Sequence, residues 1–306
     1  MIETPVHVVL AADNNFAMPM AVTIQSILDN SSTHTHYFIH ILDGGIAKKS
    51  RLKILNSLAS ERCQINWIDA KQIEKKLSAL ALPIKSCFSI VTYFRFMLAD
   101  VLPNSISRVI YLDSDVVVLN DLETLWNTEL DEFALAAVID PTIHTIGKAT
   151  HLEQLELTQH DRLLPYFNAG VILINLDLWR KEKIVEQLLS IAEKHKASLL
   201  FQDQDVLNIV LRERWLPLSP IWNQTPYLFD EESAKNASYP AEQIEDARTV
   251  PAIVHFAANP KPWAKNCTHR YLNTFYSALD NTAWKGWRPT LVGRLLRKLE
   301  LKTGLL

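Results

Sequence analysis

The chain has 306 residues, of which 48% are hydrophobic and 21% are charged, and it contains only 7 glycines. This balance excludes intrinsic disorder, collagen and coiled coil, and the length allows one or two domains whose core needs no disulfide or metal for stability. The formal net charge of −3 argues against nucleic-acid binding by the chain as a whole, so no nucleic-acid partner is expected.

Short β-rich runs alternate with amphipathic runs along most of the chain. The expected strands are Val6–Ala11, His36–Leu42, Gln64–Ile68, Arg108–Leu112, Phe133–Ile139 and Val171–Leu176. The expected helices are Ala21–Leu28, Lys48–Leu58, Ala70–Leu80, Ile90–Leu98, Asp177–His195 and Asp203–Arg212. Strands that alternate with helices are typical of parallel βαβ units, so the sequence predicts an α/β fold.

The first expected strand ends in an acidic, amide-rich turn that includes Ala11, Asp13 and Asn15. The glycine fingerprint of a dinucleotide fold does not occur here, and the sequence contains no G-K-[ST] phosphate loop. Such a turn either hydrogen-bonds a base and a ribose or forms an Asx turn that caps the next helix. The residues alone leave both interpretations open.

Asp113-Ser114-Asp115 follows the almost wholly apolar run Arg108–Leu112. Such a run is typical of a central strand in a parallel sheet, and ligands of open α/β sheets bind beyond the carboxyl ends of strands. Two carboxylates at that place repel each other unless a cation lies between them, and hard oxygen ligands suit Mg²⁺ or Mn²⁺. The alternative is an Asp pair that caps a turn.

Two later segments have polar or small residues beside expected elements. Asn168-Ala169-Gly170 precede a buried strand, where small residues either let a ligand approach the backbone or form a β-turn. Asp203-Gln204-Asp205 fall at the start of a helix, where acidic residues complement the helix dipole or hold sugar hydroxyls.

A histidine and a lysine near residue 260 are further candidates. His255 follows an apolar run, and an imidazole beside two carboxylates favours Mn²⁺ over Mg²⁺. Lys261 is a cation that suits phosphate oxygens. Each is weak evidence alone, because a single histidine is more often structural.

Seven segments in a fixed order resemble glycosyltransferase family 8, in particular its bacterial lipooligosaccharide and lipopolysaccharide galactosyltransferase-like branch. In chain order they are LAADNNF (10–16), TYFRFML (92–98), VIYLDSDVVV (109–118), LETLW (122–126), FNAGVILINLDLW (167–179), FQDQDVLN (201–208) and VHFAANPKPW (254–263). The resemblance implies a GT-A fold, a Rossmann-like, mixed and mostly parallel sheet flanked by helices, over residues 1–283. It also implies a retaining enzyme that uses a UDP-sugar donor with Mn²⁺, or Mg²⁺ in its place.

The resemblance implies a role for each matching residue. The implied metal ligands are Asp113, Asp115 and His255. The implied donor-binding residues are Ala11, Asp13, Asn15, Arg95, Ser114, Asn168, Ala169, Gly170, Asp203, Gln204 and Lys261. The implied reaction centre contains Gln204, Asp203 and Asp205. The chain departs from the family at Ala258, where glycine is common, and alanine would be strained there if the backbone required positive φ.

The expected reaction transfers a hexose, galactose rather than glucose, to a saccharide such as a lipopolysaccharide or lipooligosaccharide core. Retention follows either from front-face attack or from a covalent intermediate on Gln204 or Asp205. One alternative is a haloacid-dehalogenase-type phosphatase that uses Asp113 and Asp115, although more than 100 residues precede that motif. The other is a non-catalytic nucleotide-sugar-binding module, which would not need a metal triad together with Lys261.

The C-terminal segment, 284–306, differs in charge from the rest of the chain. Residues 285–306 contain six basic residues and one acidic residue, a net of +5, so the remainder carries −8. One face of a helix would hold Leu291, Val292, Leu295, Leu296 and Leu299, the other Arg294, Arg297 and Lys298. With Trp284 and Trp287 upstream, this pattern predicts a tail that binds the membrane surface near a glycolipid acceptor. The alternative is a helix docked on the domain.

Cysteine usage and the N-terminal residues bear on location. Cys63, Cys87 and Cys267 are far apart and odd in number, so no disulfide framework is expected. The N-terminal segment lacks a basic region, and no apolar run reaches about 18 residues, so neither a signal peptide nor a membrane-spanning helix is expected. We therefore expect a cytoplasmic protein, peripheral on the cytoplasmic face of the membrane.

Overall fold

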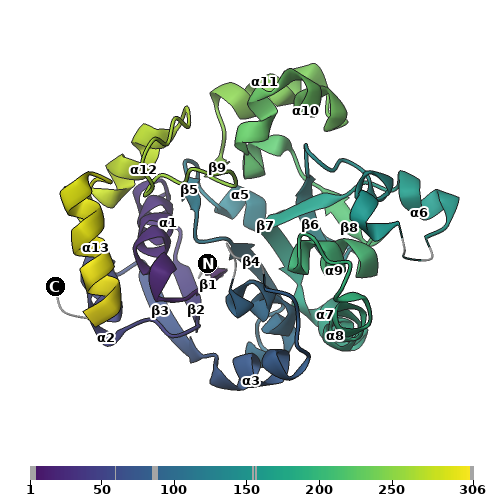
Figure 1. Cartoon of the computed structure of the whole chain (residues 1–306), viewed down its shortest axis with the longest axis horizontal. Coiled ribbons are helices and arrows are strands. Elements are labelled where there is room, and N and C mark those ends of the chain that lie inside the picture. The colour runs from purple at the N-terminus through teal and green to yellow at the C-terminus, as the bar shows by residue number, and fades with distance from the viewer. Residues whose placement is uncertain (1–4, 59, 85–88, 154, 156, 304–306) are drawn as a thin grey trace.

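The computed structural model describes residues 5–58, 60–84, 89–153, 155 and 157–303, and its centre is a seven-stranded sheet flanked by helices (Figure 1). The strand order is β3-β2-β1-β4-β7-β6-β8. The strands are β1 Val6–Ala12, β2 Tyr37–Asp43, β3 Cys63–Asp69, β4 Arg108–Leu112, β6 Leu135–Ile139, β7 Phe167–Asn175 and β8 Trp215–Pro217. The α/β class predicted from the sequence is therefore confirmed.

The sheet is mixed but mostly parallel. Neighbouring strands are parallel from β3 through β2 and β1 to β4, and β6 is parallel to β8. In contrast, β7 runs antiparallel to both of its neighbours, β4 and β6. The carboxyl ends of β1 and β4 therefore meet the start of β7 at one edge of the sheet. Ligands of open α/β sheets bind at such an edge.

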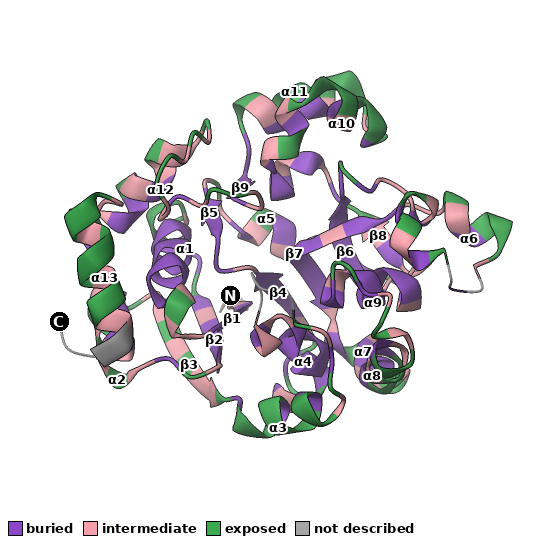
Figure 2. Ribbon diagram, in the orientation of Figure 1, coloured by how far each residue is buried: buried purple, intermediate pink, exposed green. Residues whose placement is uncertain are grey.

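Helices cover the sheet and surround it. The α-helices are α1 Ala17–Asp29, α2 Lys48–Ser57, α3 Lys71–Ala79, α4 Leu98–Val101, α5 Glu123–Trp126, α6 Gln159–Leu163, α7 Leu176–Lys181, α8 Ile184–His195, α9 Asp203–Val210, α10 Glu231–Asn236, α11 Ala241–Thr249, α12 Leu272–Leu279 and α13 Leu291–Thr303. The sheet and α1 are largely buried, while α3 and α13 are mostly exposed (Figure 2).

Alternate residues of β1 enter two separate hydrophobic cores. Val8 and Leu10 pack with α1 in one core, and Val9 packs with Trp179 and Leu188 of α7 and α8 in the other. A strand buried on both faces needs apolar residues at successive positions, because side chains alternate between the faces. This requirement explains the continuous apolar run that marked the strand in the sequence.

Four expected elements differ from the sequence prediction. β7 begins at Phe167, four residues before the expected Val171, so Asn168, Ala169 and Gly170 lie within the strand and not in a turn before it. The helix expected over Ile90–Leu98 is a 3₁₀ helix, η2 (Ile90–Met97), followed by the short α4. The helix expected over Asp177–His195 is two helices, because Lys183 between α7 and α8 has φ 53°. The first helix begins four residues earlier than expected, at Ala17, with Pro19 in its first turn.

A second, two-stranded sheet was not expected from the sequence. β5 (Val116–Val118) pairs antiparallel with β9 (Ile253–His255), and Val116 lies opposite His255. This pairing brings a residue from late in the chain next to Asp115. Strands of three residues carry too little periodicity to be detected from sequence.

The C-terminal segment contacts the rest of the protein. Trp284 is buried within the hydrophobic core that contains α1. Lys53 of α2 forms an ion pair of 2.5 Å with Glu300 of α13, and Arg288 pairs with Asp280 at 2.7 Å. Within the described residues, none of the helices has the length and apolar content needed to cross a lipid bilayer.

The cysteine prediction is tested only in part. Cys63 and Cys267 are both free thiols. Cys87 lies outside the described residues.

Candidate active site

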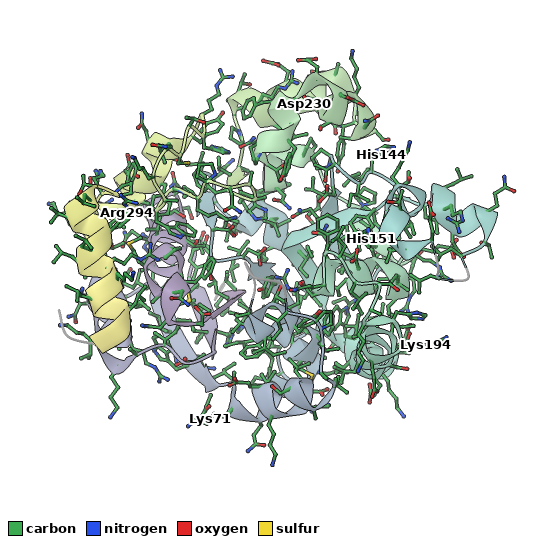
Figure 3. All side chains as sticks on the ribbon, viewed as in Figure 1. Lys71, His144, His151, Lys194, Asp230 and Arg294 are labelled. Atoms are coloured by element: carbon green, nitrogen blue, oxygen red, sulfur yellow. The ribbon has the colours of Figure 1, made fainter. Side chains whose placement is uncertain are left out.

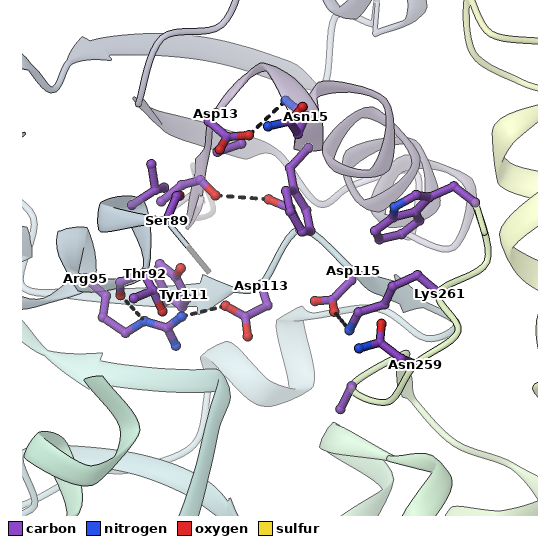
Figure 4. Close-up of a pocket in the computed structure, with 17 residues that line it drawn as sticks. Asp13, Asn15, Ser89, Thr92, Arg95, Tyr111, Asp113, Asp115, Asn259 and Lys261 are labelled. Atoms are coloured by element: carbon purple, nitrogen blue, oxygen red, sulfur yellow. Dashed lines mark hydrogen bonds and ion pairs between the residues drawn. The ribbon is translucent and has the colours of Figure 1, made fainter. Parts of the chain in front are cut away.

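A cavity of about 380 Å³ opens where the carboxyl ends of β1 and β4 meet (Figure 4). Its lining includes Ala11, Asp13, Asn15, Phe16, Thr92, Arg95, Tyr111, Asp113, Ser114, Asp115, Lys261 and Trp263. Eight of these are residues that the sequence marked as candidates. Segments that are far apart in the chain therefore meet around one space.

The turn after β1 forms one wall of this cavity. The Asp13 carboxylate accepts a hydrogen bond of 2.8 Å from the backbone N–H of Asn15, and so caps η1 (Asn14–Phe16). The Asx turn considered from the sequence is thus present. The same residues line the cavity, so the cap also fixes the shape of a binding surface.

Asp113, Asp115 and His255 form a compact group of potential metal ligands. One ligand atom from each lies within 4.8 Å of the others. His255 Nε2 lies 3.4 Å from Asp115 Oδ1 and 3.9 Å from Asp113 Oδ2. Adjacent ligands of an octahedral ion with bonds of about 2.1 Å lie about 3 Å apart, so small movements would complete the coordination.

The surroundings of this group fit a divalent cation. Asn223 Oδ1 accepts from His255 Nδ1 at 2.9 Å, which leaves the Nε2 lone pair facing the two carboxylates. A Cβ on Gly170 would lie 2.3 Å from His255 Cε1 and 2.9 Å from Asp113 Oδ2, so a side chain there would crowd two of the ligands. Two carboxylates and an imidazole suit Mn²⁺ better than Mg²⁺.

Arg95 links the carboxylates on one side of the cavity. Its guanidinium is buried, stacks over the Tyr111 ring at 4.2 Å, and pairs with Asp113 at 2.7 Å and with Asp203 at 2.9 Å. Burial raises the pKa of Asp203 to about 6, although Arg95 and the hydroxyl of Thr92 oppose this effect. Arg95 therefore holds two anionic groups that would otherwise repel each other.

Lys261 lies on the opposite side of the cavity. Its ammonium donates to Asp115 Oδ2 at 2.6 Å and to the carbonyl oxygen of Phe256 at 2.6 Å. Burial alone would raise the pKa of Asp115, but the ammonium of Lys261 holds it well below its usual value. Asp115 is consequently ionised at neutral pH, as a metal ligand must be.

A chain of hydrogen bonds connects the metal-ligand group to Gln204. Asn223 Nδ2 donates to Asn168 Oδ1 at 2.8 Å, and Asn168 Nδ2 donates to Asp140 Oδ2 at 3.0 Å. Gln204 Nε2 donates to the same Asp140 oxygen at 3.3 Å, and Gln204 Oε1 accepts from the backbone N–H of Ala169 at 3.0 Å. None of these groups lines the cavity, and Gly170, whose backbone N–H donates to Asn168 Oδ1 at 3.0 Å, lies beside them.

Asp205 does not reach the cavity. Its carboxylate is fully buried and accepts from Tyr166 Oη at 2.7 Å, from the backbone N–H of Phe201 at 2.7 Å and from His151 Nε2 at 2.9 Å. Gln204 and Asp205 are successive residues of α9, and at 3.6 residues per turn their side chains leave the helix about 100° apart, so they point in different directions.

Two residues of this arrangement were missed in the sequence. Asp140 follows the apolar strand β6 directly, as Asp113 follows β4, so the same strand-end rule could have identified it. Asn223 lies in a 3₁₀ turn, η5 (Pro220–Asn223), and no local pattern marks it. Ala258 is absent from the non-glycine residues that have positive φ within the described part of the chain, so the replacement of glycine there causes no backbone strain.

The chain is similar to several known proteins over most of its length. "General stress protein A" of Bacillus subtilis (strain 168) is 28% identical over 283 residues, which cover 91% of this chain and 94% of that protein. "Lipopolysaccharide 1,2-glucosyltransferase" of Escherichia coli (strain K12) is 28% identical over 288 residues, which cover 92% of this chain and 80% of that protein. The crystal structure of the galactosyltransferase LgtC in complex with donor and acceptor sugar analogs superposes with a TM-score of 0.76 and 27% sequence identity. The match covers 90% of this chain and 96% of that chain.

The sequence model of one family matches most of the chain. The family is described as "Glycosyl transferase family 8", and the match covers residues 7–267. It includes every residue of the candidate site, and the fold agrees with the GT-A fold of LgtC. The resemblance that the seven sequence segments indicated is confirmed, and the phosphatase alternative is set aside. The chain belongs to glycosyl transferase family 8.

Proposed function

We propose that the protein transfers a hexose, galactose in preference to glucose, from a UDP-sugar to a saccharide with retention of anomeric configuration. The observation that carries this proposal is one cavity with the Asp13–Asn15 turn on one wall and the Asp113–Asp115–His255 group with Lys261 on the other. Amide and carboxylate groups suit a base and a ribose, and the charged wall suits a diphosphate. The names of the glycosyltransferase relatives support the same reaction class.

Asp113, Asp115 and His255 would hold Mn²⁺, which supplies positive charge beside the departing diphosphate. Lys261 reaches Asp115 from the loop that follows His255, so its ammonium lies where it can add a second positive charge. Arg95 keeps Asp113 oriented toward the same place. With this charge in position, the leaving UDP needs no general acid.

Of Gln204 and Asp205, Gln204 is the better supported candidate for the side chain that faces the donor sugar. Its amide belongs to the hydrogen-bonded chain beside Gly170, whereas three donors already occupy the carboxylate of Asp205. We therefore assign Gln204 to the reaction centre together with Asp203, and assign Asp205 to holding the start of α9. Front-face attack and a covalent intermediate on Gln204 both agree with this assignment.

The acceptor is proposed to be a glycan carried by a lipid, which the protein meets at the cytoplasmic face of a membrane. The outer face of α13 exposes Leu291, Val292, Leu295, Leu296 and Leu299, with 45–68% of each residue accessible. The basic residues Arg294 and Lys298 are exposed on the same helix. Apolar and basic side chains side by side suit the interface of an anionic bilayer.

A donor screen tests the reaction. Purified protein is given UDP-galactose, UDP-glucose and UDP-N-acetylglucosamine with a saccharide acceptor, and NMR reports the anomeric configuration of the product. We expect galactose transfer with retention, loss of activity with chelator and recovery with Mn²⁺. Asp113→Asn should lower turnover by on the order of 10²–10³, while Asp246→Asn, at an exposed position on α11, should not. Inversion, or full activity in chelator, would contradict the proposal.

A further inference from the structure

The helix α13 turns one side toward the body of the protein. Arg297 and Glu300 are partly buried, while Lys298 and Leu299 between them are exposed, as are Leu295 and Leu296 in the preceding turn. Glu300 pairs with Lys53 of α2, and Arg297 reaches further, to the turn after β1. The inner side of the helix therefore has contacts that the amphipathic pattern of the sequence did not predict.

Arg297 contacts the backbone of the cavity wall. Its Nη2 donates to the carbonyl oxygen of Asn15 at 2.7 Å. Asp13 holds the backbone N–H of the same residue, so the Asn15 peptide groups are bound on both sides. A hydrogen bond from a charged guanidinium to a carbonyl oxygen is stronger than one between two neutral groups.

The same guanidinium lies beside two tryptophan rings. Its central carbon is 5.9 Å from the centre of the Trp263 ring and 5.6 Å from that of Trp287. Trp263 in turn packs edge-on against Phe16 at 5.6 Å, and both of these rings line the cavity. Arg297 thus links the turn after β1 with the loop that carries Lys261.

The surroundings of residue 297 suit an arginine side chain and not a lysine. Burial lowers the pKa of Arg297 to about 10, so the side chain is still charged at neutral pH. A planar guanidinium can stack on aromatic rings and donate in its own plane at the same time, which a lysine ammonium cannot do.

We propose that Arg297 is a positioning residue of the donor site. It holds the Asp13–Phe16 turn and the Lys261–Trp263 loop at the separation that a nucleoside diphosphate needs to span them. On this view α13 has two roles, with its outer face exposed to solvent and its inner face part of the donor site. The inference rests on the proposed UDP-sugar donor.

The test compares Arg297→Ala with Arg294→Ala in the full chain. Both variants remove one positive charge from α13, but Arg294 is exposed on the helix at the edge of the molecule (Figure 3). Isothermal titration with UDP and Mn²⁺ gives the Kd, and steady-state kinetics give KM and kcat. We expect Arg297→Ala to raise the Kd for UDP and the donor KM about tenfold, with kcat within about twofold. Arg294→Ala should match the wild type.

Two further measurements separate the possible results. Hydrogen exchange without ligand should be faster in Arg297→Ala at residues 13–17 and 261–264, which does not depend on which donor the enzyme uses. Arg297→Lys retains the positive charge and should still raise the Kd about threefold, because the planar stacking is lost. Equal Kd values for Arg297→Ala, Arg297→Lys and wild type overturn the inference alone. Absence of UDP binding by the wild type overturns the proposed function, and the inference with it.

Discussion

The side chain of Gln204 lies between the backbone of β7 and the carboxylate of Asp140. Its amide is therefore held in one orientation before any substrate binds, and a preorganised dipole is most effective where charge develops. Gln204→Ala should lower kcat by on the order of 10² while the Kd for UDP stays within about twofold, because the proposed partner is the sugar.

The measurement is steady-state transfer combined with titration of UDP. Gln187→Ala, which changes an exposed glutamine on α8, is the matched control and should leave both quantities unchanged. A large loss of UDP affinity with normal kcat would show that the start of α9 serves the nucleotide and not the sugar.

Asn223 determines which nitrogen of His255 is free. Its carbonyl oxygen accepts from Nδ1 while its amide donates to Asn168, so the orientation of both groups is fixed. Removal of a group that orients a metal ligand typically weakens metal binding about 10–100-fold. We expect Asn223→Ala to raise the Mn²⁺ concentration needed for half-maximal activity by that factor, with normal kcat at saturating Mn²⁺.

This expectation is checked by titrating Mn²⁺ into each variant, with calorimetry measuring binding and a transfer assay measuring activity. Asn236→Ala, at an exposed position on α10, supplies the control. If saturating Mn²⁺ fails to restore kcat in Asn223→Ala, the residue acts on the reaction itself and not through His255.

At the scale of single residues, the sequence identified side chains that directly follow strands. Asp13 and Asp113 come after apolar runs, and the parallel strands place both at one edge. Asn223 and Arg297 could not be found in this way, since each acts through a contact with a residue distant in sequence. Such contacts depend on tertiary packing that local pattern does not encode.

The pairing of β1 with β2 places two histidines in contact. His7 Nδ1 and His40 Nε2 are 3.0 Å apart, and Asn66 Nδ2 donates to His40 Nδ1 at 3.2 Å. Burial lowers the pKa of both histidines, that of His40 to about 4. The folded sheet therefore requires the neutral rings.

This requirement predicts acid sensitivity. The unfolded chain binds protons at these histidines below about pH 6.5, whereas the folded chain does so only near pH 4 for His40. Stability is thus fully present above pH 6.5 and decreases as the pH falls toward 4. His40 should account for about 1–2 kcal/mol of the unfolding free energy lost between pH 7 and pH 5.

Urea unfolding at pH 7, 6 and 5 measures this loss. In His40→Gln the unfolding free energy should depend less steeply on pH, because one of the titrating groups is gone. His36→Gln changes an exposed histidine and should keep the wild-type slope. An unchanged slope in His40→Gln would mean that the acid sensitivity arises elsewhere.

At the scale of elements, runs of β-branched and apolar residues were sufficient to find β1, β2, β3, β4, β6 and β7. The break between α7 and α8 was not visible, since the apolar periodicity continues through Lys183 and no glycine marks its positive φ. β5, β8 and β9 were missed because each has three residues. Tertiary pairing, and not local preference, determines such short strands.

At the scale of the whole molecule, the uneven charge has a structural counterpart. The positive C-terminal segment forms a helix along one side of an otherwise acidic protein (Figure 1). Its contacts through Trp284 and Arg297 make deletion of residues 284–306 a poor test of membrane binding. Deletion would remove part of the core and the link to the donor-site turn together with the surface.

Substitutions on the outer face of α13 give a sharper test of membrane contact. The double variant Leu295→Glu/Leu296→Glu places charge where we propose lipid contact, yet both residues are exposed in the folded protein. It should bind anionic vesicles on the order of tenfold more weakly, because apolar burial and charge attraction are both reduced. Transfer to a small soluble acceptor should be unchanged, since Arg297 remains in place.

Sedimentation with vesicles that contain phosphatidylserine provides the measurement, and Leu163→Glu provides the control, because Leu163 is a 73% exposed leucine on the distant α6. Attraction between basic side chains and lipid extends only about 8 Å at 0.15 M salt, so high salt should release much of the wild-type protein. Leu163→Glu should sediment like the wild type. If the double variant also sediments like the wild type, the exposed leucines of α13 do not contact lipid, and the basic side chains alone would have to account for any binding.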